Sequence, residues 1–289
     1  AELLPHSDVD LLILHEGFPD MAAEMAEPYL HCLWDLGLPV SHALRTPGEC
    51  VVDAEEITTQ TALLEARQLA GDSHLFRRMR KRLETEVLTD PDGFMAAKLA
   101  EQSQRHDRYG GPVYSLEPNV KESWGGLRDI HTLFWVAKYR HGVPHISHLA
   151  QAGVLAADEQ RDLRRAQDFL WRVRAALHYL SGRNENRLLF DHQRVLAARF
   201  GYHDTEATLA VEKFMKRFFR TAHQVVAITG IALEAFRERA GAQAVRRSRV
   251  ETVALAVQGS RERSAHARPA RRARSATGII RMPRARVSW

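Results

Sequence analysis

The sequence predicts an α+β protein in which a small mixed domain precedes a helical one. An apolar run of strand length, Leu11 to Leu14, stands near the start of the chain, and a helical pattern and a second short strand follow it. From Leu127 onward, apolar residues recur at helical spacing with few interruptions. After residue 240, arginine, alanine and serine dominate and the apolar periodicity fades. These changes of character divide the chain into a mixed domain, a helical domain and a tail.

The mixed domain is expected to open with a strand, a helix and a second strand. Glycine and proline mark the ends of its elements: Gly37 follows the first helical pattern, and Thr46-Pro47-Gly48 predicts a turn after the second strand. The expected elements after the first strand are a helix over 19–36, a strand over 38–44, a helix over 57–69, two helices within 73–107 separated at 89–93, and a short extended run over 113–121.

The helical domain is expected to bury two apolar stripes. Its predicted helices cover residues 127–141, 158–181, 192–200 and 205–239. One stripe contains Leu163, Phe169, Leu170, Val173, Leu177 and Leu180, and the other contains Phe214, Phe218, Val225, Ile228 and Leu233. Side chains in such positions are typical of the core of a helical bundle.

The net charge of +5 is the sum of two segments of opposite sign. Residues 241–289 contain twelve arginines and two acidic residues, which gives this tail a charge of +10 and leaves −5 for residues 1–240. Affinity for nucleic acid would therefore depend on the tail alone. We expect residues 241–289 to be an Arg-rich tail that is disordered or translated out of frame, and we do not expect nucleic acid as a partner.

Nothing in the sequence indicates a membrane protein or a disulfide framework. No apolar run reaches membrane-spanning length, and the N-terminus lacks the basic and apolar regions of a secretory leader. The two cysteines, Cys32 and Cys50, are too few for a disulfide framework or a zinc site, so reduced thiols are expected. The sequence therefore predicts a soluble, cytoplasmic protein without a membrane partner.

Two acidic residues at the entrance of the first strand are the strongest chemical feature. Asp8 and Asp10 are two residues apart, so an extended strand directs both carboxylates to the same side. Such a pair suits Mg²⁺, which proteins commonly bind through one or two carboxylates together with substrate phosphates. The pattern predicts phosphoryl or nucleotidyl transfer. The alternative is a pair of surface acids at a strand entrance with no metal.

Six short stretches are spread in order along residues 1–240. They are His6 to Leu12, Leu63 to Asp72, Leu116 to Glu122, Gly125 to His131, Ala166 to Arg174 and Arg187 to Gln193. Together they resemble the bacterial protein-PII uridylyltransferases of the GlnD type. Gly125 to Ile130 also resembles the glutamine synthetase adenylyltransferases, whereas Glu117 to Glu122 favours the PII branch.

The resemblance implies a nucleotidyltransferase domain of the DNA polymerase β type over residues 1–135 and a helical domain over 136–240. Members of the family transfer UMP from UTP to a tyrosine hydroxyl of the PII signal protein and release pyrophosphate, in nitrogen regulation. The implied cofactor is Mg²⁺, the substrate is UTP and the partner is PII. The family also has an HD-type hydrolase domain and ACT domains, neither of which we expect in this chain.

The resemblance also assigns roles to individual acidic residues. Asp8 and Asp10 match the paired carboxylates that hold Mg²⁺ during in-line displacement. Glu56 is the expected third catalytic carboxylate, with Asp53 and Glu55 as the next candidates. The alternative for these last three is that they are surface acids before a helix.

Basic and glycine residues of the matched motifs are expected at the triphosphate. Arg67, Lys121 and Arg128 would contact its oxygens, since positioning and charge stabilisation are most of what a protein supplies to this reaction. The alternative for Arg128 is an ion pair with a nearby acid. Gly125 and Gly126 would allow a tight turn or a close approach of the backbone.

One difference from the family puts the activity of this chain in question. The family carries a glycine-rich turn before the position of Glu2, whereas this sequence starts at Ala1, so we expect the first strand of the domain to be missing and UTP binding to be weak. The dipeptide His203-Asp204 is expected to form a turn rather than a hydrolase site. His141, His145 and His148 are not expected to hold a metal.

Three functions remain open from the sequence. The first is the transferase itself, with the glutamine synthetase adenylyltransferase activity as a variant of it. The second is a non-catalytic fragment that docks PII or regulates such an enzyme. The third is a nucleic-acid binder that uses the basic tail.

Overall fold

The computed structural model describes residues 3–109 and 115–266, with backbone alone for residues 240 and 242–266. Residues 1–237 form one compact unit, and a second unit begins at Glu238. The elements up to residue 109 are β1 Val9–Leu14, α1 Pro19–Asp35, β2 Val40–Arg45, α2 Pro47–Asp53, α3 Ile57–Glu65, α4 Ser73–Arg82, a π-helical turn Leu83–Val87 and α5 Pro91–Arg108. The elements after residue 115 are α6 Leu127–His141, a 3₁₀ turn Ile146–His148, α7 Ala157–Ser181, α8 Phe190–Arg199 and α9 Ala210–His266.

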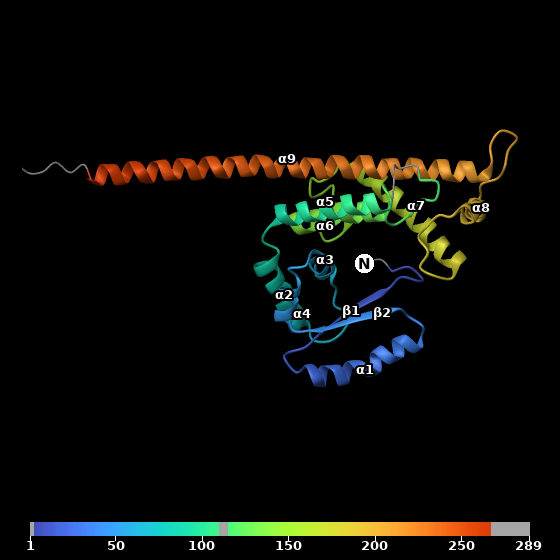
Figure 1. Ribbon diagram of the computed structural model, residues 1–289, viewed down its shortest axis with the longest axis horizontal. Helices are drawn as coiled ribbons and strands as arrows, with labels where there is room; N and C mark the ends of the chain where they lie inside the picture. Colours follow the sequence, from blue (N-terminus) through green and yellow to red (C-terminus); the bar gives the residue numbers. More distant parts are fainter. Residues whose placement is uncertain (1–2, 110–114, 267–289) are drawn as a thin grey trace, which may run out of the picture. The chain divides into compact units, whose positions relative to one another are not determined.

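The two strands form a parallel sheet, in which Asp10 lies opposite Ser41 and Leu14 lies opposite Arg45. Parallel neighbours need a crossover connection, and α1 provides it. Helix α1 covers one side of the sheet, while α2, α3 and α4 lie on the other (Figure 1). The predicted order of strand, helix and strand is therefore confirmed, and the described part of the chain is an α+β structure.

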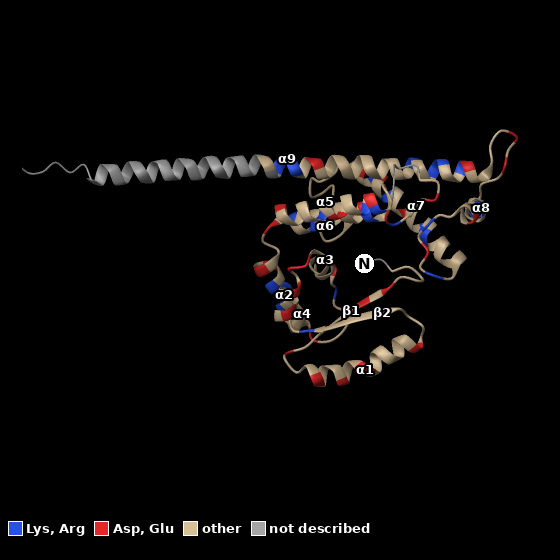
Figure 2. Ribbon diagram, in the orientation of Figure 1, with Lys and Arg blue, Asp and Glu red and all other residues tan. Residues whose placement is uncertain are grey.

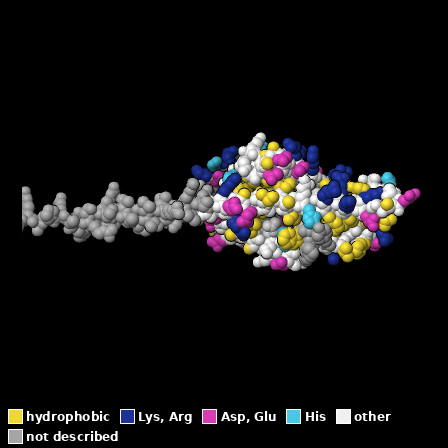
Figure 3. All heavy atoms as spheres, turned by 90° about the horizontal axis from the view of Figure 1, so that it is seen from above, with side chains coloured by type: hydrophobic (Ala, Val, Ile, Leu, Met, Phe, Trp, Pro, Cys, Tyr) yellow, Lys and Arg dark blue, Asp and Glu magenta, His cyan; other side chains and the backbone are white. Residues whose placement is uncertain are grey.

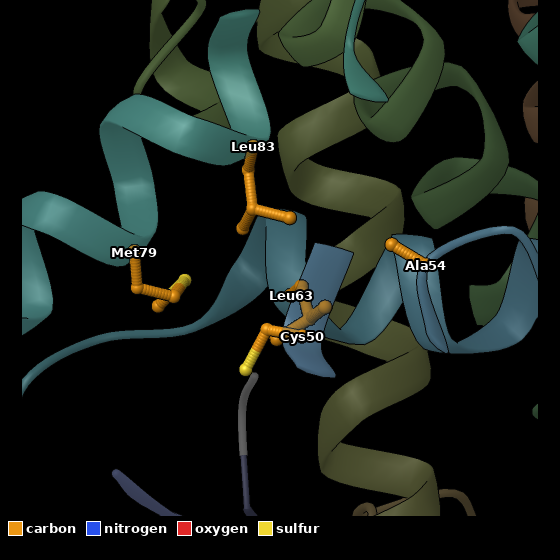
Figure 4. Close-up of a cluster of buried hydrophobic side chains, with 5 residues drawn as sticks. All are labelled: Cys50, Ala54, Leu63, Met79 and Leu83. Carbon is orange, nitrogen blue, oxygen red and sulfur yellow. The ribbon is translucent and has the colours of Figure 1, made fainter. Parts of the chain in front are cut away.

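A small core joins the sheet to the helices on the second side. Its buried members are Cys50, Ala54, Leu63, Met79 and Leu83, which come from α2, the end of α2, α3, α4 and the π-helical turn (Figure 4). Leu12 and Leu14 of β1 pack against this cluster. The sheet is thus fixed to the α2–α4 layer through alternate residues of β1.

The two cysteines differ in their environment and are expected to differ in reactivity. Both are free thiols; Cys32 is exposed and Cys50 is buried in the cluster of Figure 4. Burial raises the pKa of the Cys50 thiol to about 11, and the thiolate is the reactive form. At neutral pH we expect a disulfide-exchange reagent to modify one thiol of the folded chain quickly and both thiols in denaturant. A Cys32→Ser variant that still reacts quickly when folded would contradict this expectation.

Helix α2 was not predicted, because Thr46-Pro47-Gly48 has the composition of a turn. The structure instead uses these residues to start a helix. The Glu49 amide donates to Thr46 Oγ1 over 3.2 Å, and the Thr46 amide donates to Glu49 Oε2 over 2.7 Å. This is a capping box with proline in the first turn, a combination that begins helices.

Helix α3 ends earlier than predicted, at Glu65 rather than at residue 69. After it, the Gln68 side chain donates to the Gly71 carbonyl over 2.9 Å, which stabilises a turn in place of another helical turn. Asp72 then caps α4 by accepting from the His74 amide over 2.7 Å. The predicted break at 89–93 is confirmed, because Asp90 caps α5 through the Gly93 amide.

The predicted apolar stripes of the helical region are buried. Every residue of the two stripes except Leu180 is less than a tenth exposed. Helices α5 and α6 pack side by side, and α7 contacts α6 and α8. Helix α6 begins and ends at the predicted residues and runs without a break across residue 135, where we had expected the first domain to end. The division into domains at 135 stays a prediction.

Helix α9 continues far beyond the predicted end at residue 239 and reaches His266. The expectation of disorder is therefore wrong for residues 241–266, which the structure describes as helical. Alanine, arginine and glutamate in this segment are good helix formers, and proline first appears after it, at Pro269. Residues 267–289 of the predicted tail lie outside the described residues, as do residues 113 and 114 of the predicted extended run.

The described helices contain no segment that is long and apolar enough to cross a membrane. On the face drawn in Figure 3, acidic and basic side chains occur together among hydrophobic ones. The mixture agrees with the moderate negative charge of residues 1–240.

Candidate functional site

The acidic pair lies on the side of the sheet that faces the α2–α4 layer. Alternate residues of a strand share a face, and Leu12 and Leu14 pack into the core of that layer. Asp10 follows the same alternation, so its carboxylate is on that face, away from α1, and Asp8 lies directly before the first residue of β1. Both residues are exposed, and Figure 2 shows the acidic colour at the start of β1.

The donor set of the pair fits a hard divalent cation. Two exposed carboxylates on one face of a strand offer oxygen ligands and leave the remaining positions of a metal open to water and phosphate oxygens. No group of three or more His, Cys, Asp or Glu side chains that could hold a metal occurs among the described residues. The pair would therefore hold a metal together with a phosphate-bearing ligand rather than in a closed protein cage.

Two of the three candidates for a third carboxylate, Glu56 and Asp53, are engaged elsewhere in the structure. Glu56 stands before α3 and accepts hydrogen bonds from Thr58 and, over 2.9 Å, from Thr59. These hydroxyl groups hold the pKa of the Glu56 carboxyl below its ordinary value. Asp53 forms an ion pair of 2.7 Å with Arg45. A catalytic role for Glu56 stays a prediction, as it does for Asp53 and Glu55.

Three cations surround one carboxylate at the start of α6. Glu122 lies 3.2 Å from Arg128, 3.5 Å from Lys121 and 3.7 Å from Arg105. Burial acts to raise the pKa of the Glu122 carboxyl, but these cations, Arg128 first, outweigh it and the pKa is lowered. Arg128 also stacks over Trp135, with 5.4 Å from guanidinium carbon to ring centroid. The ion pair with an acid that was the alternative for Arg128 is present, and its contact with a triphosphate stays a prediction.

This cluster has an excess of positive charge in a half-buried place. Arg105 also pairs with Asp129 over 2.6 Å, so Lys121 and Arg128 share the single negative charge of Glu122. Burial, and then the charge of Arg128, lower the pKa of Lys121. Charge-assisted hydrogen bonds to phosphate oxygens would relieve that excess. Arg67 lies in a different part of the chain from this cluster. It is exposed and stands in the non-helical segment between α3 and α4. Its contact with a nucleotide stays a prediction.

The two glycines of the matched motif have a packing role in the structure. Gly125 has a φ of +71°, and a Cβ placed on it would overlap the backbone of Ala222 in α9. A Cβ on Gly126 would lie 2.8 Å from the carbonyl oxygens of Lys121 and Ser123. The predicted tight turn and close backbone approach therefore occur between protein segments. Contact of these glycines with a nucleotide stays a prediction.

We expect Gly125→Ala to lower the free energy of unfolding by about 3 kcal/mol, from the left-handed backbone together with overpacking against Ala222. Gly182→Ala is the matched control: Gly182 has a φ of +65° with open space around it. The control should lose about 1–2 kcal/mol, the cost of the backbone conformation alone. Urea unfolding measures both, and equal losses would contradict the close approach to Ala222.

Several buried polar residues at the site were not predicted from the sequence. Arg174 and His178 are buried on α7, and Asp129 is buried on α6. His131 has a pKa lowered to about 3, first by burial and then by the charges of Arg128 and Arg174, so it is neutral at physiological pH. One feature of the sequence could have indicated the burial of Arg174 and His178. Each directly follows a residue of the apolar stripe, Val173 or Leu177, so each lies near the buried face of its helix.

The dipeptide His203-Asp204 lies in the turn before α9, as predicted. Asp204 accepts from the Ala210 amide over 2.6 Å, and the His203 carbonyl accepts from Lys213 over 2.9 Å. Both residues are exposed. These contacts of His203 and Asp204 stabilise the first turn of α9.

Comparison with known proteins gives one family and a set of close relatives. Residues 93–233 match the family described as GlnD PII-uridylyltransferase. A bifunctional uridylyltransferase/uridylyl-removing enzyme of Bradyrhizobium sp. (strain ORS 278) is 47% identical over 232 residues, which are 79% of this chain and 25% of the relative. Enzymes of the same name from Pseudomonas savastanoi pv. phaseolicola and Azotobacter vinelandii are 43% identical over 82% of this chain and 27% of their own length. The chain thus spans about a quarter of the length of these relatives.

Proposed function

We propose that this chain, which belongs over residues 93–233 to the GlnD PII-uridylyltransferase family, carries the site that transfers UMP from UTP to a tyrosine of the PII signal protein. The observation that carries the proposal is that Arg174 lies within electrostatic range both of Asp8, just before β1, and of Arg128, in the cation cluster at the start of α6. A nucleoside triphosphate needs both features, because its phosphates bind cations of the protein and a metal at once.

In the proposed reaction the acidic pair holds the metal and the cations hold the triphosphate. Asp8 and Asp10 would bind Mg²⁺, which supplies neutralisation of the phosphate charge and a lower pKa of the attacking hydroxyl. Lys121 and Arg128 would bind the phosphate oxygens and stabilise the charge that develops on the leaving pyrophosphate. The tyrosine oxygen forms a bond to the α-phosphorus, the bond from that phosphorus to the bridging oxygen breaks, and the hydroxyl proton is released.

The remaining sequence predictions take a supporting place in this proposal. Glu56 would be the third carboxylate and Arg67 a further contact to the triphosphate. Gly125 and Gly126 would keep the turn that sets Lys121 and Arg128 next to each other. Residues 1–135 would form the polymerase-β-like nucleotidyltransferase domain, and residues 136–240 a helical domain that covers it.

The contacts of Glu56 with Thr58 and Thr59, and of Asp53 with Arg45, favour a second candidate function, because they occupy the candidates for a third carboxylate. In that case the chain docks PII without transferring UMP. The two functions are separated by incubating the chain with Mg²⁺, PII and UTP labelled at the α-phosphorus. The proposed transferase labels a tyrosine of PII and stops doing so in EDTA. A chain that retains PII on an affinity column but never labels it has the second function, and a chain that does neither contradicts both.

A further inference from the structure

The segment that precedes the acidic pair is bound by a histidine of α7. The His6 amide donates to Nδ1 of His178 over 3.3 Å, across 172 positions of sequence. The two imidazole rings lie 6.1 Å apart at 43°. His178 is fully buried, and His6 is two residues before Asp8. A side chain of the helical region therefore holds the backbone at the entrance of β1.

The other nitrogen of the same ring faces Asn186. His178 Nε2 is 3.5 Å from Asn186 Oδ1, and Arg174 Nε donates to that oxygen over 2.5 Å. Because Nδ1 accepts from a backbone amide, the neutral ring carries its hydrogen on Nε2 and points it at Asn186. Burial, and then the charge of Arg174, lower the pKa of His178, which keeps the ring neutral. The His6 amide thus sets the tautomer of His178, and Asn186 orients the ring through Nε2.

Asn186 in turn is joined to the segment that carries the cations. The backbone carbonyl of Asn186 accepts from the Val120 amide over 2.8 Å. The adjacent residues Asn119 and Arg187 form an antiparallel bridge, which extends the pairing of the two segments. Val120 directly precedes Lys121. One chain of hydrogen bonds therefore runs from the backbone before Asp8 through His178 and Asn186 to the backbone before Lys121.

The charges nearby agree with this arrangement. Burial lowers the pKa of Arg174, the charge of Arg128 lowers it further, and Asp8 acts in the opposite direction. Arg174 is therefore within electrostatic range of both an acid of the pair and a cation of the cluster.

We propose that His178, oriented by Asn186, is a positioning residue that sets the segment 6–10, and with it Asp8, at a fixed place relative to Lys121 and Arg128. Its consequence for nucleotide binding rests on the proposed function, whereas its effect on the segment itself does not. His178 does not touch the reacting atoms in this proposal; it acts through the backbone of His6.

Hydrogen exchange of the peptide that contains residues 6–14 tests the positioning directly. In His178→Ala the amides of this peptide should exchange about tenfold faster than in the unsubstituted chain, the effect of one lost hydrogen bond. His178→Asn should restore most of the protection, because Asn Oδ1 occupies the place of Nδ1 and accepts from the His6 amide. Tyr179→Ala, at an exposed neighbour on the same helix, is the control and should leave the peptide unchanged.

A second measurement separates this inference from the proposed function. The dissociation constant of UTP with Mg²⁺ should rise about tenfold in His178→Ala and return toward the original value in His178→Asn. Faster exchange of the 6–14 peptide in a chain that binds no UTP would overturn the proposed function and support the positioning role. Unchanged exchange of the 6–14 peptide in a folded His178→Ala would overturn the positioning role. So would an equal rise in the exchange of the α6 peptide in His178→Ala, or exchange of the 6–14 peptide in His178→Asn as fast as in His178→Ala.

Discussion

Asp129→Ala is expected to lower the free energy of unfolding by about 3–5 kcal/mol, the cost of removing one partner from a buried charged network. The Asp129 carboxylate is almost fully buried. One of its oxygens accepts from Arg105 over 2.6 Å and from Gln102 and His106 over 2.9 Å, and the other accepts from the Gly125 amide over 2.8 Å. The loss is a large part of the stability of an ordinary domain, so the variant should unfold at a much lower urea concentration.

The same network predicts how stability depends on pH. Burial acts to raise the pKa of Asp129, but the His106 contacts and the Gln102 and Arg105 interactions outweigh it, so the folded pKa lies below the ordinary 3.8. A depressed pKa gives stability that is present above the ordinary value and is lost as the pH falls through the folded one. Asp129→Ala should therefore lose less stability than the unsubstituted chain on acidification.

Asp107→Ala is the control for Asp129→Ala, because Asp107 is an exposed acid on α5. It should change the free energy of unfolding by less than about 0.5 kcal/mol. Urea unfolding followed by far-ultraviolet circular dichroism measures both variants. A loss below about 1 kcal/mol in Asp129→Ala would mean that the network does not hold α5 to α6.

The double variant Asp8→Asn, Asp10→Asn should lose Mg²⁺-dependent binding of UTP and keep its fold. Both side chains are exposed, so stability should change little. The metal contributes several kcal/mol of charge stabilisation at such a site, which corresponds to about a 100-fold or larger rise in the dissociation constant. Isothermal titration with UTP in the presence and absence of Mg²⁺ measures the effect.

Asp20→Asn is the matched control for the acidic pair. Asp20 is also exposed and lies on α1, on the opposite side of the sheet. It should leave UTP affinity unchanged. Equal affinity in the double variant and in the unsubstituted chain would remove Asp8 and Asp10 from the proposed site.

Most of the fold could be predicted because local patterns determine it. Helix α7 carries one of the two predicted apolar stripes, and the ends of α6 and α7 agree with the prediction to within one residue. The relationship to PII uridylyltransferases, inferred from six short motifs, is confirmed by the comparisons. Helix α2 was missed because a capping box and a turn share the same residue types. The end of α9 at His266 could not be predicted from apolar periodicity, which fades after residue 239, although the helix propensity of its residues favours a helix there.

The acidic pair could be predicted because its spacing and the strand are contiguous in sequence. The residues that bind the segment before this pair could not be predicted, because their contacts are long-range. His178 contacts His6 across 172 positions, and Asn186 contacts Val120 through backbone atoms that leave no signal in residue type. The packing of Gly125 against Ala222 likewise depends on how α9 lies over the turn. Such contacts come from the tertiary structure alone.

The central claim is that the acidic strand entrance and the cation cluster share one metal-nucleotide site. Replacing Mg²⁺ by Fe²⁺ in the presence of UTP, ascorbate and peroxide, and mapping the backbone cuts by mass spectrometry, tests it most directly, since the radicals cut only near the metal. The account predicts UTP-dependent cuts both at residues 8–10 and within 119–128. Cuts at neither segment, or at 8–10 with none in 119–128, would contradict it.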